Sequence, residues 1–279
     1  MEISTSSSPS HGPRPTRGRW ATRLIGTELL KLRTMRVSYG LALAACAVTA
    51  LFASLEAARA GDRVQPVSTA AGLGSVTTAT GVALVFAAIL GVIASTGEFR
   101  HGSATLTYLA TPARGRVLAA KATAAAVAGA LYGLAAAVVA TGVGLIFVAA
   151  QGDHVTLGAG TLTGHILGAG LAAALFAAAG VGVGALIRSQ LAGVIVVFAW
   201  CLVAETILGG MVKAVRPYLP YTAASTLGGA KLGTAAFGPG YSVSGQSPLP
   251  FIGAAALVAG LGVLLALVAG RTTVPRDIT

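Results

Sequence analysis

The stretch Gly97–Lys121, GEFRHGSATLTYLATPARGRVLAAK, is a polar island between two long apolar segments, Val76–Thr96 and Val117–Ala149. The whole chain of 279 residues is 55% hydrophobic and only 10% charged, so it has few charged side chains to place. This one island gathers a set of charged and imidazole side chains: Glu98, Arg100, His101, Arg114, Arg116 and Lys121. Such a concentration indicates a surface that meets water or a partner protein.

The segments on either side of the island belong to a set of apolar runs. The mean hydropathy is +0.81, and several runs reach about 20 residues, the length that crosses a hydrocarbon core as a helix. The runs stay apolar at odd and even positions alike, whereas a membrane β-barrel would alternate. We therefore expect an all-α polytopic membrane protein with six transmembrane helices, at about 37–55, 76–96, 117–149, 162–187, 191–212 and 251–270. The third run is too long for one straight crossing, and we expect its start to be a cytoplasmic extension.

The residues before the first span divide into two parts. Residues 1–19 are rich in Ser, Pro and Arg and are predicted to form a disordered basic arm. Residues 20–279 are predicted to form a single transmembrane domain. It opens with Trp20–Arg36, in which an apolar stripe lies beside charged positions. This pattern predicts an interfacial helix on the membrane surface. The alternative is a positively charged flank that holds the first span in place.

The distribution of Lys and Arg predicts the orientation in the membrane. Fourteen of the 19 basic residues lie in the arm and entry helix, in the second–third and fourth–fifth connections and in the tail, and five lie in the other connections. Basic residues concentrate on the cytoplasmic side, so both termini are expected there. Because these residues flank apolar runs, the net charge of +11 indicates membrane topology and not nucleic-acid binding. The Ala- and Gly-rich composition favours a bacterial cell membrane.

The sequence offers no constellation for catalysis by this chain alone. A phosphate-binding loop needs Gly-Lys followed by Ser or Thr, but the four lysines follow Leu30, Ala120, Val212 and Ala230. The four histidines have no Cys or carboxylate at metal-ligand spacing, so no metal site and no bound cofactor are expected.

Within the island, the sequence predicts a short helix. Ser103 is a candidate N-cap, and Thr105–Ala110 can form a helix that ends before Pro112. Leu106 and Leu109 then project from one side of an otherwise polar loop. Two interpretations stay open, a helix that docks on a partner and an ordinary helix at the membrane surface.

The residues of the island resemble a known motif. Glu98-Phe99-Arg100-His101-Gly102-Ser103, then Thr105-Leu106, then Thr111-Pro112-x-Arg114 and Lys121, are similar to the cytoplasmic motif of permease subunits of type-2 ABC exporters. The entry helix, the six spans and the long external segment before the last span fit the same family. The resemblance implies that the loop is a coupling helix that sits in a cleft of an ATPase. The coupling role then falls on Glu98, Phe99, Arg100, Gly102, Ser103, Thr105 and Leu106, and His101 fills a variable slot.

The same resemblance implies partners and a mechanism. The chain would be no enzyme itself, because a separate ABC ATPase subunit would bind ATP and Mg²⁺ and hydrolyse the nucleotide. Two permease chains, as a homodimer or a pair, would complete an exporter of hydrophobic or amphipathic substrates. Closure of the ATPases would push the loop, and the second and third spans would rotate. The alternatives are an ion- or proton-coupled secondary carrier, which predicts paired intramembrane charges or a repeat, and a non-transporting scaffold.

Two further features, both expected in the outer half of the membrane, carry predictions. Glu205 is the one acid deep within a predicted span, about 21 Å from its cytoplasmic end at 1.5 Å per residue. It is either a residue of the substrate path or gate, or a group hydrogen-bonded to neighbouring helices or hydrated near the outer interface. Thr222–Phe237 could dip into the membrane from outside if it packs against protein. Apart from these two features, small-xxx-small spacing at Gly129/Gly133, Gly160/Gly164/Gly168 and Gly180/Gly184 could mark a dimer seam.

Overall fold

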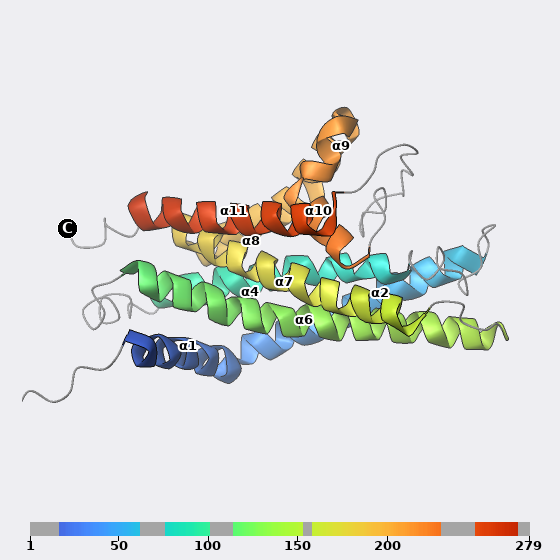
Figure 1. The fold of residues 1–279 in the computed structure, drawn as a ribbon, viewed down its shortest axis with the longest axis horizontal. Helices are drawn as coiled ribbons and strands as arrows, with labels where there is room; N and C mark the ends of the chain where they lie inside the picture. The colour runs from blue at the N-terminus through green and yellow to red at the C-terminus, as the bar shows by residue number, and fades with distance from the viewer. Residues whose placement is uncertain (1–16, 62–75, 101–113, 153–157, 230–248, 273–279) are drawn as a thin grey trace, which may run out of the picture.

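The computed structural model describes residues 17–61, 76–100, 114–152, 158–229 and 249–272, and these residues form helices and short connections with no strand among them (Figure 1). The elements, in chain order, are α1 (Arg17–Thr34), α2 (Arg36–Gly61), the 3₁₀ turn η1 (Thr78–Thr80), α4 (Gly81–Arg100), α6 (Arg114–Ala150), α7 (Ala159–Ile187), α8 (Gln190–Phe198), the π-helical stretch η2 (Ala199–Ala204), α9 (Glu205–Met211), the 3₁₀ helix η3 (Lys213–Tyr218), α10 (Pro220–Leu227) and α11 (Phe251–Thr272).

The six predicted spans are confirmed as helices long and apolar enough to cross a membrane. They are Arg36–Arg59, Thr78–Gly97, Gly115–Ala150, Ala159–Ile187, Gln190–Met211 and Phe251–Thr272. The entry helix is present as α1, which begins at Arg17, inside the arm predicted for residues 1–19. The rest of that arm lies outside the described residues, and the location of α1 at a membrane surface stays a prediction.

The long third span is one uninterrupted helix of 37 residues, α6. It runs alongside α11 and continues well past the first residue of α11 (Figure 1). The cytoplasmic extension expected at the start of α6 stays a prediction.

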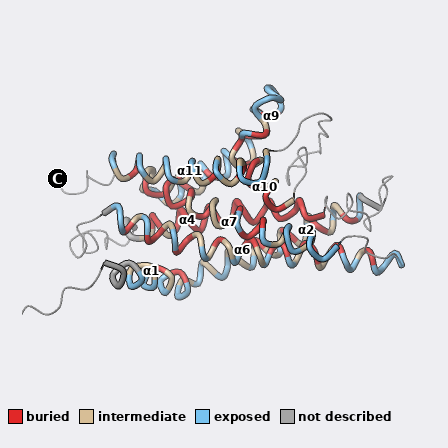
Figure 2. Tube along the Cα trace, in the orientation of Figure 1, coloured by how far each residue is buried: buried red, intermediate tan, exposed pale blue. Residues whose placement is uncertain are grey.

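The interior of the bundle is built around α4 and α7. In an 18-residue stretch of the second span, Thr78–Gly97, 89% of the residues are buried, against 11% in such a stretch of α11. Figure 2 shows the buried residues concentrated along the inner helices. Helix α4 contributes large apolar side chains to this core, among them Leu84 and Val92. The buried positions of α7 are Ala and Gly except for Phe176 and Val181. Because the buried residues of α7 are small, its neighbours can approach it closely, which is how spans gain van der Waals contact in lipid.

The small-residue motifs serve these contacts inside the chain. A Cβ added at Gly133 would lie 2.3 Å from the carbonyl oxygen of Ala169, and one at Gly180 would lie 2.1 Å from that of Ala88. Gly129 and Gly184 likewise meet atoms of neighbouring helices of the same chain. These two motifs therefore lie at contacts within the chain, joining α6 to α7 and α7 to α4, while a dimer seam at Gly160/Gly164/Gly168 stays a prediction.

Substituting Gly180 with alanine is expected to destabilise the protein, because the methyl group overlaps the Ala88 carbonyl and pushes α4 from α7. Overpacking of this kind costs about 1–3 kcal/mol. The matched control is Gly164→Ala on the same helix, where nothing lies within 4 Å of an added Cβ. Thermal unfolding in detergent should show a lower melting temperature for Gly180→Ala only. Equal melting temperatures for the two variants would contradict this close contact.

The turn between the fourth and fifth spans is as short as predicted. Arg188 adopts a left-handed conformation with φ 58°, and its N–H donates to the carbonyl of Gly184 at 2.9 Å. Ser189 then caps α8 by accepting from the N–H of Ala192 at 3.4 Å. A left-handed residue followed by a polar N-cap reverses the chain within two residues.

The fifth span departs from a straight crossing. The π-helical stretch η2 separates α8 from α9, and α9 leaves the bundle at a steep angle (Figure 1). The chain then returns through η3 to α10, which packs against α4, α7 and α11. The described part of the segment expected to dip inward, up to Gly229, therefore does pack against protein, and residues 230–237 lie outside the described part.

Candidate functional site

The predicted coupling segment lies at the edge of what the structure describes. Glu98, Phe99 and Arg100 form the last turn of α4, and their side chains lie outside the described residues. Gly102, Ser103, Thr105 and Leu106 lie in the 101–113 segment, also outside them, so the coupling helix stays a prediction. This segment connects α4 to α6, and α1 packs on α6. Figure 1 places the C-terminal end of α11 at the same end of the bundle as the end of α4 and the start of α6.

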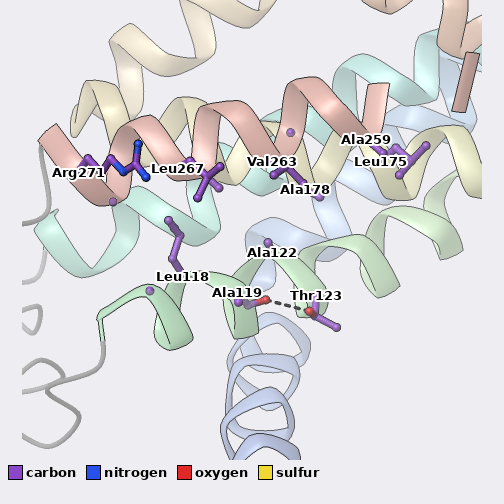
Figure 3. A pocket seen from close by; sticks show the side chains of 14 residues that line it. Leu118, Ala119, Ala122, Thr123, Leu175, Ala178, Ala259, Val263, Leu267 and Arg271 are labelled. Carbon is purple, nitrogen blue, oxygen red and sulfur yellow. Dashed lines mark hydrogen bonds between the residues drawn. The ribbon is translucent and has the colours of Figure 1, made fainter. Parts of the chain in front are cut away.

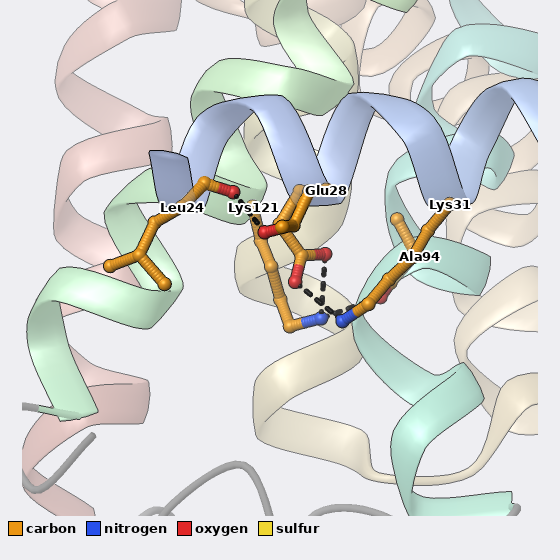
Figure 4. Close-up of polar contacts among 6 residues, drawn as sticks. Leu24, Glu28, Lys31, Ala94 and Lys121 are labelled. Atoms are coloured by element: carbon orange, nitrogen blue, oxygen red, sulfur yellow. Dashed lines mark hydrogen bonds and ion pairs between the residues drawn. The ribbon is translucent and has the colours of Figure 1, made fainter. Parts of the chain in front are cut away.

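A buried polar junction ties these three helices together (Figure 4). Glu28 of α1 is only 7% exposed, and its Oε2 accepts from Nζ of Lys121 on α6 at 3.0 Å. Its Oε1 accepts from Lys31, one turn further along α1, at 2.7 Å. Nζ of Lys121 also lies 3.5 Å from the carbonyl oxygen of Ala94 on α4, at the limit of a hydrogen bond. One ammonium group therefore contacts the entry helix and the second span at once.

Apolar packing surrounds this junction. Leu32 of α1 is buried in a cluster with Leu90 of α4 and with Ala124 and Tyr132 of α6. Further along, the hydroxyl of Tyr132 donates to the backbone carbonyl of Ser38 at the start of α2. Water is thus kept from Glu28 and Lys121, and in such a shielded site the loss of one charge partner is costly to the other.

Glu28 is the site residue that the sequence reasoning missed. Lys121 closes the quoted motif, but nothing there assigned it an acidic partner 93 positions upstream. A signal was available. The chain has only eight acidic residues, and Glu28 sits in an otherwise basic helix on the same side as Leu24 and Lys31. A lone acid among cations on the apolar side of a helix indicates a cationic partner on the neighbouring element.

Near the C-terminal end of the fifth span, Glu205 is 4% exposed and accepts four hydrogen bonds. Oε1 accepts from the indole N–H of Trp200 at 2.9 Å and from the backbone N–H of Tyr221 at 2.7 Å. Oε2 accepts from the backbone N–H of Thr222 at 3.0 Å and from its hydroxyl at 3.2 Å. All four donors come from this chain.

Through these contacts Glu205, a residue of α9, caps the N-terminus of a different helix, α10. Helix α10 begins with Pro220, which has no N–H, and Leu219 at its N-cap makes no side-chain cap. The next two N–H groups, of Tyr221 and Thr222, have no acceptor one turn earlier within the helix. The Glu205 carboxylate accepts from both, and a negative charge suits a helix N-terminus. This is the hydrogen-bonded arrangement that was one of the two interpretations, while the substrate-path role stays a prediction.

The rest of α10 is held just as closely. A Cβ added at Gly168 of α7 would lie 1.8 Å from the carbonyl oxygen of Leu227, the last residue of α10. The Tyr221 ring packs edge-on against Phe176 with centroids 6.2 Å apart. Burial raises the pKa of the Tyr221 hydroxyl, and the nearby Cys201 and Glu205 add to the shift. Beyond α10, Gly229 adopts a positive φ of 86° beside the ring of His165.

Comparison with known proteins tests the resemblance. Among the described residues, no three His, Cys, Asp or Glu side chains lie close enough to hold a metal ion. No curated protein matches the chain. A family model described as "ABC-2 family transporter protein" matches residues 24–204, which include α2 to η2, the junction and the predicted coupling segment. The chain therefore belongs to the ABC-2 family of transporter membrane proteins, as a multi-pass permease.

Proposed function

We propose that this permease is the transmembrane subunit of an ATP-driven exporter whose ATPase is a separate polypeptide. The observation that carries the proposal is the family match across residues 24–204 together with six spans. ATP and Mg²⁺ bind to the partner ATPase, and two permease chains, as a homodimer or a pair, form the path for a hydrophobic or amphipathic substrate. Both termini are cytoplasmic and the membrane is a bacterial cell membrane, as the distribution of basic residues and the composition indicate.

The coupling role belongs to the segment that connects α4 to α6. Glu98, Phe99, Arg100, Gly102, Ser103, Thr105 and Leu106 carry it, on the strength of their match to the family motif. The junction of Glu28, Lys121 and Ala94 supports the mechanical part of this proposal. It fixes the two spans that flank the segment to each other and to α1. A push on the segment then moves three helices together, because a rigid base transmits displacement where a flexible one absorbs it.

The role assigned to Glu205 is the positioning of α10 against α4 and α7. Four hydrogen bonds already satisfy its two oxygens, so a substrate would need to displace a donor of this chain to reach it. Its carboxylate instead holds the outer end of the bundle in one arrangement.

Substituting Leu106 with aspartate is expected to abolish co-purification of the ATPase. In the proposed docked state the Leu106 side chain is desolvated, and burying an unpaired carboxylate there is far costlier than burying an isobutyl group. The chain is expressed in membranes with a candidate ATPase subunit, and the amount of ATPase retained in detergent is measured for each variant.

Two matched variants control this experiment. His101→Asp places the same charge in the variable slot of the same segment and is expected to retain the ATPase. Leu106→Met keeps an apolar side chain of similar volume and is expected to retain it as well. If the wild-type chain and Leu106→Asp retain the ATPase equally, the segment is not the coupling element.

A further inference from the structure

An apolar groove runs along one side of the bundle, with a volume of about 630 Å³ (Figure 3). Its walls are α6, through Leu118 and Ala122, and α11, through Val263 and Ala266. Its floor is α7, where Leu175 and Ala178 lie. The groove exists because the neighbouring positions on both walls are Gly or Ala, which leave the space between the helices unfilled. It is open along its side, so molecules of the surrounding bilayer can enter it without crossing the protein.

The length of the groove matches one leaflet of a bilayer. Helix α11 has 22 residues, or about 33 Å at 1.5 Å per residue, close to the whole hydrocarbon core of about 30 Å. The groove follows α11 from Ala259 to Arg271, which is about 18 Å on the same rise. It therefore extends from the end of the span to near the middle of the membrane.

Charge distinguishes the two ends of the groove. Arg271, exposed in the last turn of α11, lines the end at the membrane surface. Figure 3 shows its side chain extending along α11 towards Leu267. The rest of the lining is apolar except for Thr123, whose hydroxyl donates to the carbonyl of Ala119 at 2.8 Å and is thereby satisfied. An apolar trough of leaflet length with one guanidinium at its mouth is complementary to an acyl chain that carries an anionic headgroup.

We infer that this groove binds an anionic phospholipid, with an acyl chain between α6 and α11 and the headgroup phosphate on the Arg271 guanidinium. The lipid is a resident of the leaflet at the end of the bundle where α11 terminates, which the proposed topology makes the cytoplasmic one. Its binding joins α11 to α6, two helices that meet mainly through α7.

The inference is tested by counting the lipids that the purified chain retains. The protein is reconstituted in vesicles of equal parts phosphatidylglycerol and phosphatidylcholine, extracted in mild detergent and weighed by native mass spectrometry. The wild-type chain is expected to retain phosphatidylglycerol preferentially. Arg271→Gln should lower that preference about fivefold, the contribution of one basic side chain near an anionic surface. Arg33→Gln, which removes an exposed arginine of α1 that does not line the groove, should leave it unchanged.

The acyl chain is tested separately. Ala266→Phe and, on the opposite wall, Ala119→Phe fill the groove and should remove the retained lipid whatever its headgroup. Leu264→Phe, at a position of α11 that is 57% exposed and outside the lining, is the matched control. Equal retention of both headgroups by the wild-type chain, or unchanged retention in Arg271→Gln or in both filling variants, would overturn the inference. A measured mass of two chains without lipid, falling to the mass of one chain in the filling variants, would overturn it as well. The groove would then be an interface between copies of the chain. These masses are read without the ATPase, so a failure of the ATPase to co-purify leaves the result standing.

Discussion

Replacing Glu205 with alanine is expected to release α10 from the bend of the fifth span and to lower the melting temperature by more than any exposed substitution does. The change leaves the N–H groups of Tyr221 and Thr222 and the indole N–H of Trp200 without their acceptor. Each buried donor left unsatisfied costs about 1–3 kcal/mol. Because α10 packs against α4, α7 and α11, its release also exposes part of the core. Hydrogen exchange in the peptide that carries Tyr221 and Thr222 should accelerate strongly.

A graded series separates the charge from the shape of the Glu205 side chain. Glu205→Gln keeps one oxygen acceptor but turns an N–H₂ group towards another donor. Its melting temperature should therefore fall between those of Glu205→Ala and the wild-type chain. Glu56→Ala is the matched control, because Glu56 makes an exposed i,i+3 pair with Arg59, and such pairs contribute about 0–1 kcal/mol. Trp200 fluorescence in a Trp20→Phe background reports the lost indole hydrogen bond directly. Unchanged fluorescence and exchange in Glu205→Ala would show that the carboxylate does not hold α10.

The spans were predictable from the sequence because hydropathy over about 20 residues is a local property. The short turn was predictable for the same reason, since Arg188 and Ser189 interrupt two apolar runs. The bend at Ala199–Ala204 was not, because the sequence AWCLVA is as apolar as the helix on either side of it. A π-helical stretch has no composition of its own, and Glu205, directly after it, makes its contacts with a segment 16 and 17 residues downstream.

The long-range pairs in the candidate site mark the same limit. The Glu28–Lys121 pair joins residues 93 positions apart, and each residue alone has the local features of a charged flank at a membrane surface. For the glycine motifs, the sequence indicated the contact but not the partner. Their spacing correctly indicated close helix contact at Gly133 and Gly180. Spacing does not say which helix approaches, and both contacts lie within one chain. The coupling segment itself still rests on its motif.

Substituting Glu28 with alanine is expected to destabilise the protein by about 3–5 kcal/mol, as loss of one partner of a buried ion pair does. The two sides of the junction are not equivalent. Lys121 is 5% exposed, and without Glu28 its ammonium group loses the carboxylate at 3.0 Å. Without Lys121, Glu28 keeps Lys31 at 2.7 Å. Lys121→Met, which keeps an unbranched side chain one atom shorter, should therefore cost clearly less than Glu28→Ala.

The double variant Glu28→Leu with Lys121→Met decides whether the junction serves stability or coupling. Two apolar residues of similar volume often replace a buried ion pair at little cost or with a gain, so the melting temperature should recover towards wild type. Measured against the single variants Glu28→Leu and Lys121→Met, the free energy of unfolding should be non-additive by about 0.5–3 kcal/mol. The exposed Glu56–Arg59 pair, mutated in the same way, should show a non-additivity of about 0–1 kcal/mol. Export by the double variant with the ATPase bound is then the decisive measurement. Since the Lys121 contact to Ala94 of α4 is lost, we expect ATP hydrolysis to continue and export to fall. Full export would show that packing alone holds α1, α4 and α6 together during transport.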